Sequence, residues 1–216
     1  MPADCFGLDA DVLSQIPLFS GLRFDSVKQI ASVGSVVSYK RATRVLNRGD
    51  VLDGFYVVFQ GHLKLFMLSC DGAERVLRVL EPGNSFGEAM MFNGFPSPVF
   101  VESLSTTELA YFPGEKVSKI LTADADLSAA MLRSMSTLLR ELIHDLEACC
   151  LMNARQRTIA YLLRVAETDG QPQSQVHLPA TKWIVASTLD LSAETFSREL
   201  HRLQDEGLIQ IDRRTI

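Results

Sequence analysis

The sequence predicts an α+β fold in three parts: an amino-terminal β roll, a long helix and a carboxyl-terminal winged helix-turn-helix. Three observations support this prediction. Short strands separated by glycines begin near Val36, apolar residues then recur at intervals of three and four, and two short amphipathic helices follow near the end. We place the roll and its short flanking helices in residues 1–126, the long helix in 127–152 and the last domain in 153–216.

The first part of the chain changes from helical to strand-like spacing. Residues 11–22 and 26–33 carry apolar side chains at helical intervals, so we expect two helices there. The strand candidates that follow are residues 55–59, 62–68, 74–80 and 99–112, with glycines between them. Asp71-Gly72 is a strong signal for a hairpin turn. Evenly spaced strands and turns predict a compact roll or barrel, whose interior is the expected ligand pocket.

A long helix is expected after a short one at residues 116–121. Its apolar residues alternate at intervals of three and four, the spacing that two parallel helices bury against each other. This stripe, called the seam below, consists of Leu132, Met135, Leu139, Leu142, Leu146 and Cys149. We therefore expect a homodimer; the alternative is that the stripe packs against the roll of its own chain. We interpret Cys149 as a small apolar filler rather than an intersubunit disulfide.

Near the carboxyl end, residues 183–200 predict two short helices joined by a tight turn, which is a helix-turn-helix. Ser192 is a good N-cap for the second helix, and Phe196 and Leu200 are expected to point inward. Glu194, Ser197 and Arg198 fall at i, i+3 and i+4 and form what we call the recognition face. Arginine matches the two acceptors of guanine and a carboxylate accepts from cytosine, so this face suits a G·C pair. The alternative is an ordinary helical hairpin with solvated charges.

The residues after the second helix predict a winged domain. A glycine stop at Gly207 is followed by an alternating strand and the start of a turn, and the chain stops inside this hairpin, so we expect an incomplete wing. Asp190 in the turn tolerates a left-handed backbone. Further candidate DNA contacts are Thr195, Ser192, Lys182 and Arg202.

Composition excludes several classes of protein. The chain has 216 residues, is 47% hydrophobic and has a formal net charge of −5, so general attraction to nucleic acid is not predicted. Neither a membrane span nor a signal segment is evident, and we expect a cytoplasmic protein without a membrane partner. Cys5, Cys70, Cys149 and Cys150 lack metal-ligand spacing, so no iron-sulfur cluster is expected. We find no catalytic set and predict no enzyme.

Four motifs in this order resemble the CRP/FNR family of bacterial transcription regulators. They are Asn47-Arg48-Gly49-Asp50, Gly61-His62-Leu63-Lys64, Pro82-Gly83-Asn84-Ser85-Phe86-Gly87-Glu88 and Glu194-Thr195-Phe196-Ser197-Arg198. The resemblance covers nearly the whole chain and implies a cyclic-nucleotide-binding-like roll that senses an effector. It also implies double-stranded DNA with TTGAT-like inverted repeats as the target, read by the recognition face, and RNA polymerase as a partner if the protein activates. A module that has lost DNA binding is the alternative.

The resemblance implies an effector other than cyclic AMP. Cyclic-nucleotide binders follow Phe-Gly-Glu with an arginine for the phosphate, whereas no Lys or Arg lies between Phe86 and Leu104 here. Gly87 to Phe92, followed by Pro96, instead resembles the dissimilatory nitrate respiration regulator type, which implies a heme-dependent nitric oxide sensor. The expected pocket is lined by Phe86, Gly87, Glu88, Met90, Met91, Phe92, Leu142 and Ile143, with His62 or His144 as the candidate heme ligand. A cyclic nucleotide or another small ligand is the alternative.

Overall fold

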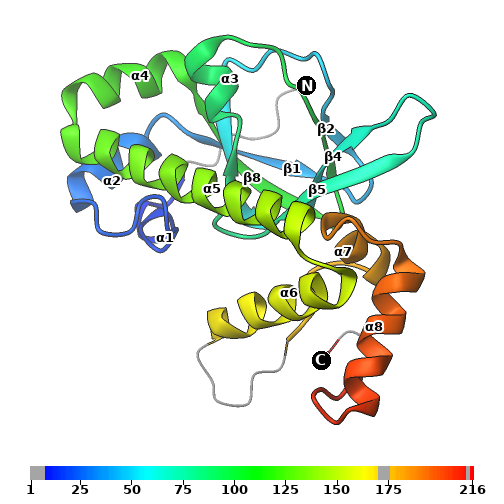
Figure 1. Cartoon of the computed structure of the whole chain (residues 1–216). Coiled ribbons are helices and arrows are strands. Elements are labelled where there is room, and N and C mark those ends of the chain that lie inside the picture. Colours follow the sequence, from blue (N-terminus) through cyan, green and yellow to red (C-terminus); the bar gives the residue numbers. More distant parts are fainter. Residues whose placement is uncertain (1–7, 170–175, 213–214) are drawn as a thin grey trace. The chain divides into compact units, whose positions relative to one another are not determined.

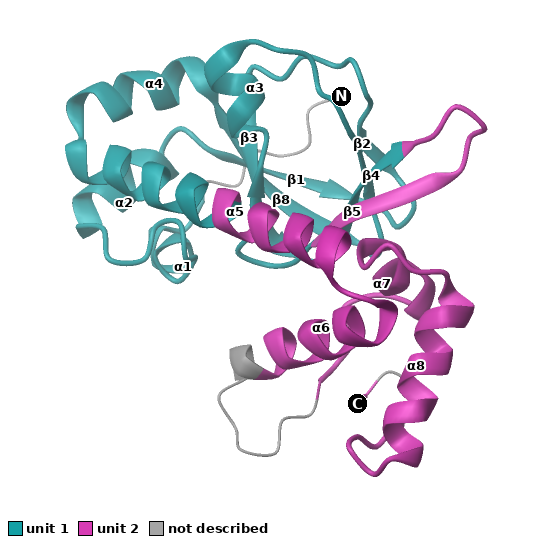
Figure 2. Cartoon of the chain, viewed as in Figure 1, with its two compact units in different colours: residues 1–67, 80–138 teal, residues 68–79, 139–216 magenta. Residues whose placement is uncertain are grey.

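The computed structural model describes residues 8–169, 176–212 and 215–216 (Figure 1). It divides into two compact units, which consist of residues 1–67 with 80–138 and of residues 68–79 with 139–216 (Figure 2). The strands are β1 Ser35–Tyr39, β2 Arg44–Leu46, β3 Gly54–Gln60, β4 Leu63–Leu68, β5 Glu74–Leu80, β6 Ser85–Phe86, β7 Phe100–Ser103 and β8 Thr107–Pro113. The helices are α1 Ala10–Ser14, α2 Phe24–Ala31, α3 Glu88–Asn93, α4 Gly114–Ala123, α5 Ala125–Leu151, α6 Ala154–Asp169, α7 Lys182–Thr188 and α8 Ala193–Asp205.

The strands form two antiparallel four-stranded sheets. Their orders are β1-β8-β3-β6 and β2-β7-β4-β5. The register of the first sheet pairs Val57 with Ala110 and also with Ser85. Gly54 stands opposite Pro113 at the end of β3, where an added Cβ would lie 2.3 Å from the carbonyl oxygen of Phe112. Only a glycine fits this close approach of backbone to backbone.

Strand alternation gives the first sheet two different buried faces. Phe55 and Val57 pack with Phe112 against α1, α2, α4 and the start of α5, which Figure 1 shows on the same side of this sheet. Val58 and Leu109 point the other way and form a core with residues of the second sheet, among them Leu46, Leu63, Leu80 and Val101. The predicted β roll is therefore confirmed, and its interior is a packed core of side chains from both sheets.

The second unit contains the helix-turn-helix. Phe196, Leu200 and Leu203 of α8 are buried at spacings of four and three residues and pack with residues from α6 and α7. This spacing places them on one side of the helix, as the apolar periodicity predicts. None of the helices in residues 8–169 and 176–212 is long and apolar enough to cross a membrane.

Three predicted elements differ from the structure. The helix expected over residues 11–22 ends at Ser14, because Pro17 cannot continue it. The apolar side chains that follow lie in turns and are nevertheless buried. The single strand expected over residues 99–112 is two strands. The turn between them is held by the Leu104 N–H, which donates to the carbonyl of His62 at 2.7 Å.

The strand expected after α8 is also wrong. Gly207 ends the helix with a left-handed φ of 75°, as predicted, but residues 208–211 form no strand. The pairing there includes two isolated bridges, in which Thr215 pairs with Asp212 and with His177, and two backbone hydrogen bonds between Val176 and Ile216. The end of the chain therefore pairs with the segment before α7. Part of the predicted wing, residues 213–214, lies outside the described residues.

Candidate nucleic-acid interface and effector region

The turn between α7 and α8 is fixed by an arginine that local sequence does not reveal. Asp190 has a φ of 56°, in the left-handed region that Asp tolerates. Arg157 of α6 donates from Nη1 to the carbonyl oxygens of Leu189 at 2.9 Å and of Asp190 at 3.3 Å. The same nitrogen lies 3.6 Å from Asp190 Oδ2. A cation is favourable where the carbonyls of a helix end are exposed, so Arg157 stabilises both the end of α7 and the turn.

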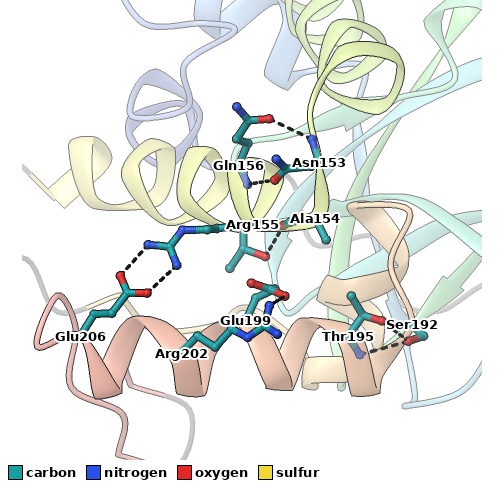
Figure 3. Close-up of polar contacts among 10 residues, drawn as sticks. Asn153, Ala154, Arg155, Gln156, Ser192, Thr195, Glu199, Arg202 and Glu206 are labelled. Carbon is teal, nitrogen blue, oxygen red and sulfur yellow. Dashed lines mark hydrogen bonds and ion pairs between the residues drawn. The ribbon is translucent and has the colours of Figure 1, made fainter.

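The predicted N-cap of α8 is present. Ser192 Oγ accepts a hydrogen bond from the Thr195 N–H at 3.1 Å and donates to Thr195 Oγ1 at 2.9 Å (Figure 3). This cap satisfies one of the amide donors that the first turn of a helix leaves unpaired. The hydroxyls of Ser192 and Thr195 therefore bond to each other at the N-terminus of α8. Any contact of these hydroxyls with DNA would be made from this hydrogen-bonded pair.

The recognition face lies opposite the buried side of α8. Glu194 and Arg198 are exposed and Ser197 is half-buried, whereas Phe196 is fully buried. Because residues three and four apart share a helix side, the structure brings the three predicted side chains together on one accessible surface. A carboxylate and a guanidinium there can accept from and donate to base edges. Lys182, another candidate contact, is the first residue of α7 and is half-buried.

Arg202 has a partner that the sequence analysis did not identify. Its Nη1 lies 2.9 Å from Oε1 of Glu199, a residue of the same helix that is only 4% exposed (Figure 3). Burying a carboxylate is costly unless it is paired, so Arg202 serves to neutralise Glu199. The i, i+3 spacing was the available signal for this pair.

An ion pair with two hydrogen bonds joins the start of α6 to the end of α8. Arg155, near the start of α6, donates from Nη1 and Nη2 to the two carboxylate oxygens of Glu206 at 2.7 and 2.6 Å (Figure 3). These hydrogen bonds lower the pKa of Glu206 and raise that of Arg155. Next to it, the side-chain oxygens of Asn153 and Gln156 each accept a hydrogen bond from the backbone N–H of the other residue and cap the start of α6. The pair therefore connects α6 to the residue that follows α8.

The seam is an exposed apolar stripe on α5. The residues of this helix that are buried, Leu127, Ala130 and Met131, all lie in its first two turns. By contrast, the leucines of the seam remain accessible in the single chain; Leu132, Leu139 and Leu146 are each at least 60% exposed. Exposed apolar stripes of this kind mark contact surfaces.

The predicted effector residues are distributed over several environments. Phe86 and Met90 belong to the core between the two sheets, whereas Met91 packs on the core next to the helices and Phe92 is 45% exposed. Gly87, with a φ of 104°, precedes α3, and the half-buried Glu88 is the first residue of that helix. Leu142 and Ile143 belong to the second unit and are both more than half exposed.

Aromatic rings line the roll side of β3. Tyr56 stacks on Phe86, with ring centroids 5.1 Å apart, and is tilted against Tyr111 at 5.0 Å. Burial, followed by the neighbouring Tyr39, raises the pKa of Tyr56. Burial and a hydrogen bond to Asp53 raise that of Tyr111. Both phenols therefore ionise only above the ordinary tyrosine pKa of 10.0.

The two candidate heme ligands lie in different units and have different surroundings. His62 is half-buried at the start of the segment that leads into β4, and its backbone N–H donates to Ser105 Oγ at 3.1 Å. The side chain of His144 is 68% exposed, with Nδ1 3.6 Å from Oε2 of Glu147. The role of either histidine as a heme ligand stays a prediction.

Comparison with known proteins assigns both ends of the chain. The cyclic nucleotide-binding domain matches residues 36–124, and the Crp-like helix-turn-helix domain matches residues 156–216. Over 203 residues, 93% of this chain and 91% of that protein, the sequence is 30% identical to the Cyclic AMP receptor protein of Thermus thermophilus. The chain belongs to the CRP/FNR family of transcription regulators.

Solved structures agree with this family assignment. The structure of FixK2 from Bradyrhizobium japonicum has a TM-score of 0.75 over 85% of this chain and 92% of that chain; at 19% identity, this likeness shows the fold alone. DNR from Pseudomonas aeruginosa is 31% identical over 95% of this chain and 91% of that chain, with a TM-score of 0.52. This CRP/FNR member is therefore a DNA-binding regulator with an effector-binding domain, and not an enzyme. The alternative of an ordinary helical hairpin at residues 183–200 is excluded.

Proposed function

We propose that the protein binds inverted repeats with TTGAT-like half-sites as a homodimer, through the recognition face of each α8. The observation that carries this proposal is the two-sided character of α8. Phe196 and Leu200 are completely buried, while Glu194 and Arg198 are exposed in the first two turns after a formed N-cap. The first turns of a recognition helix are the part that reaches base edges in the major groove.

The chemistry of the recognition face supports a G·C pair in each half-site. The guanidinium of Arg198 can donate two hydrogen bonds to O6 and N7 of guanine, and the carboxylate of Glu194 can accept from the amino group of cytosine. Ser197 lies between them on the same side and can contact either base. With no net positive charge to supply general attraction, these contacts carry a large share of the specificity.

The seam supports dimerisation. A parallel pair of α5 helices would bury its exposed leucines and place two recognition helices for an inverted repeat, with half-sites about 34 Å apart. An effector that changes the packing of these helices would change DNA affinity, and by reciprocity DNA would change effector affinity by the same factor. If the regulator activates, RNA polymerase is the further partner.

The decisive experiment measures binding of the purified protein to a labelled TTGAT inverted repeat by fluorescence anisotropy at fixed salt. Arg198→Ala should lose about 1 to 3 kcal/mol of binding free energy per half-site and discriminate less against substitution of the guanine. Arg48→Ala removes an exposed arginine of the first unit and serves as the charge-matched control. An unchanged preference for guanine in Arg198→Ala would contradict the assignment, and equal affinity of the wild type for a scrambled duplex would contradict the target.

We further propose that the effector lacks a phosphate group, because a phosphate would need a cation in the pocket. Residues 87–103, which follow the Phe86 strand, contain no Lys or Arg, and a buried phosphate without a cation is costly. Heme is the candidate that the resemblance implies. We propose His62 as its ligand, because His62 is half-buried, whereas His144 is exposed and next to Glu147. Bound heme would supply an iron that takes up a diatomic gas.

Two titrations separate these effectors. Hemin added to the purified protein should give a saturable Soret band that shifts with nitric oxide, and His62→Ala should alter the band while His144→Ala should not. Calorimetry with cyclic AMP should show no binding. A cyclic AMP titration that saturates would favour the cyclic-nucleotide alternative, and the absence of any Soret change would exclude heme.

A further inference from the structure

A short segment of β5 contacts the turn of the helix-turn-helix. The first six residues of this strand, 74–79, belong to the second unit together with α7 and α8. The Arg75 guanidinium forms an ion pair with the carboxylate of Asp190, and the Val76 N–H donates to Ser187 Oγ at 2.9 Å. Val76 is only 1% exposed. Two adjacent residues of the strand therefore hold both ends of the turn that precedes α8.

This turn sets the direction in which α8 begins. The Asp190 N–H donates to the carbonyl of Ser187 at 3.2 Å, and Asp190 adopts the left-handed backbone two residues before the N-cap Ser192. Its carboxylate lies between two guanidiniums, because Oδ1 contacts Arg75 and Oδ2 lies 3.6 Å from Arg157. Arg157 comes from α6 of the same helical core, whereas Arg75 comes from a strand. The turn is thus held once from inside the helical core and once from β5.

The same strand also contacts the long helix. Arg78 Nη2 lies 2.9 Å from Oε2 of Glu141 on α5, a position one residue before Leu142 of the seam. Residues 68–79 continue in sequence from β4 and into Leu80, which is part of the core between the two sheets. One strand therefore carries a contact to the helix-turn-helix and a contact to the proposed dimer helix, and it is continuous with the roll.

We infer that Arg75 is a positioning residue for DNA binding, and that β5 orients α8 through the paired contacts Arg75 to Asp190 and Val76 to Ser187. The inference rests on the proposed function, because the quantity it controls is the affinity of the recognition face. An exposed ion pair alone contributes little to folding stability. Its effect is therefore on the orientation of α8.

The first test observes the contact without DNA. In full-length protein with nitrogen-labelled valine, the exchange rate of the Val76 amide should be slow in the wild type and should rise about tenfold in Ser187→Ala and in Arg75→Ala. The amide of Val57, in the core of the first unit, should not change. Arg48→Ala is the matched control. If the Val76 amide exchanges at the same rate in all variants, the contact does not exist in solution and the inference is overturned.

The second test asks whether the contact positions the recognition face. Arg75→Ala should weaken binding to the TTGAT inverted repeat by about 2- to 30-fold with an unchanged melting temperature, and Arg75→Lys should restore most of the affinity. Asp190→Asn should have a similar effect, and the double variant should lose no more than either single one. Additive losses, or full affinity in Arg75→Ala, would overturn the role of Arg75. If the wild type ignores the repeat, the proposed function fails, whereas the exchange measurement still judges the contact.

Discussion

Arg155 and Glu206 face each other across the helical core as a two-point ion pair, with nitrogen-oxygen distances of 2.7 and 2.6 Å. The pair connects α6 to the C-cap of α8, the helix that carries the recognition face. Both side chains are accessible, and the stability that they contribute therefore depends on pH and salt.

Glu206→Gln should remove a stabilisation that depends on pH. The folded pKa of Glu206 lies below its ordinary value of 4.5 because Arg155 binds the ionised form. The contribution is therefore fully present at neutral pH and is lost as the pH falls below 4.5 and through the folded pKa. The difference in melting temperature between wild type and variant should shrink over that range. Asp205→Asn is the control, and a difference that stays constant with pH would contradict the role of the ion pair.

Phe196→Ala should destabilise the second unit strongly. Phe196 is completely buried among residues of α6, α7 and α8, so truncation leaves a cavity that costs about 3 to 5 kcal/mol. Phe95→Ala, at a position 69% exposed in the first unit, should change stability by no more than about 0.5 kcal/mol. Trp183, the one tryptophan of the sequence, lies on α7 and reports the unfolding by fluorescence in urea. Equal midpoints for the two variants would show that α8 is not part of this core.

Leu142→Lys should separate the proposed dimer. The charge would be placed in the middle of an apolar seam, where it could not be solvated once two helices meet. Light scattering should give a mass of twice 23.9 kDa for the wild type and 23.9 kDa for the variant, with weaker binding to the inverted repeat. Leu163→Lys, at an exposed leucine of α6, should leave the mass unchanged. A wild type that is already monomeric at every concentration tested would contradict the dimer.

Local patterns were sufficient to predict elements with a regular apolar pattern and helix ends marked by a capping residue or a glycine. The alternation in β3 and β5, the glycine stop at Gly207 and the cap at Ser192 all lie where the sequence analysis expects them. The errors fall on segments where a proline ends the helix or where a distant partner decides. Ile16, Leu18 and Phe19 are buried although they lie in turns around Pro17, and Ile216 pairs with Val176, far away in sequence.

The candidate site shows the same division. The three residues of the recognition face lie together because their spacing on a helix requires it. In contrast, the burial of Glu199, which gives Arg202 an ion-pair partner on its own helix, depends on the packing of α8 in the folded unit. The roles of Arg75 and Arg157 at Asp190 join positions 115 and 33 residues apart, which no local pattern indicates.

The sequence by itself determined which sides of the helices and strands are apolar, where helices begin, and the family to which the chain belongs, because these depend on residue type and spacing along the chain. Tertiary structure alone decided which charges meet across the second unit, and which buried side chains fill the roll. Ion pairs and packing depend on the distance between atoms in space, and folding brings together residues whose separation along the chain carries no record of that distance.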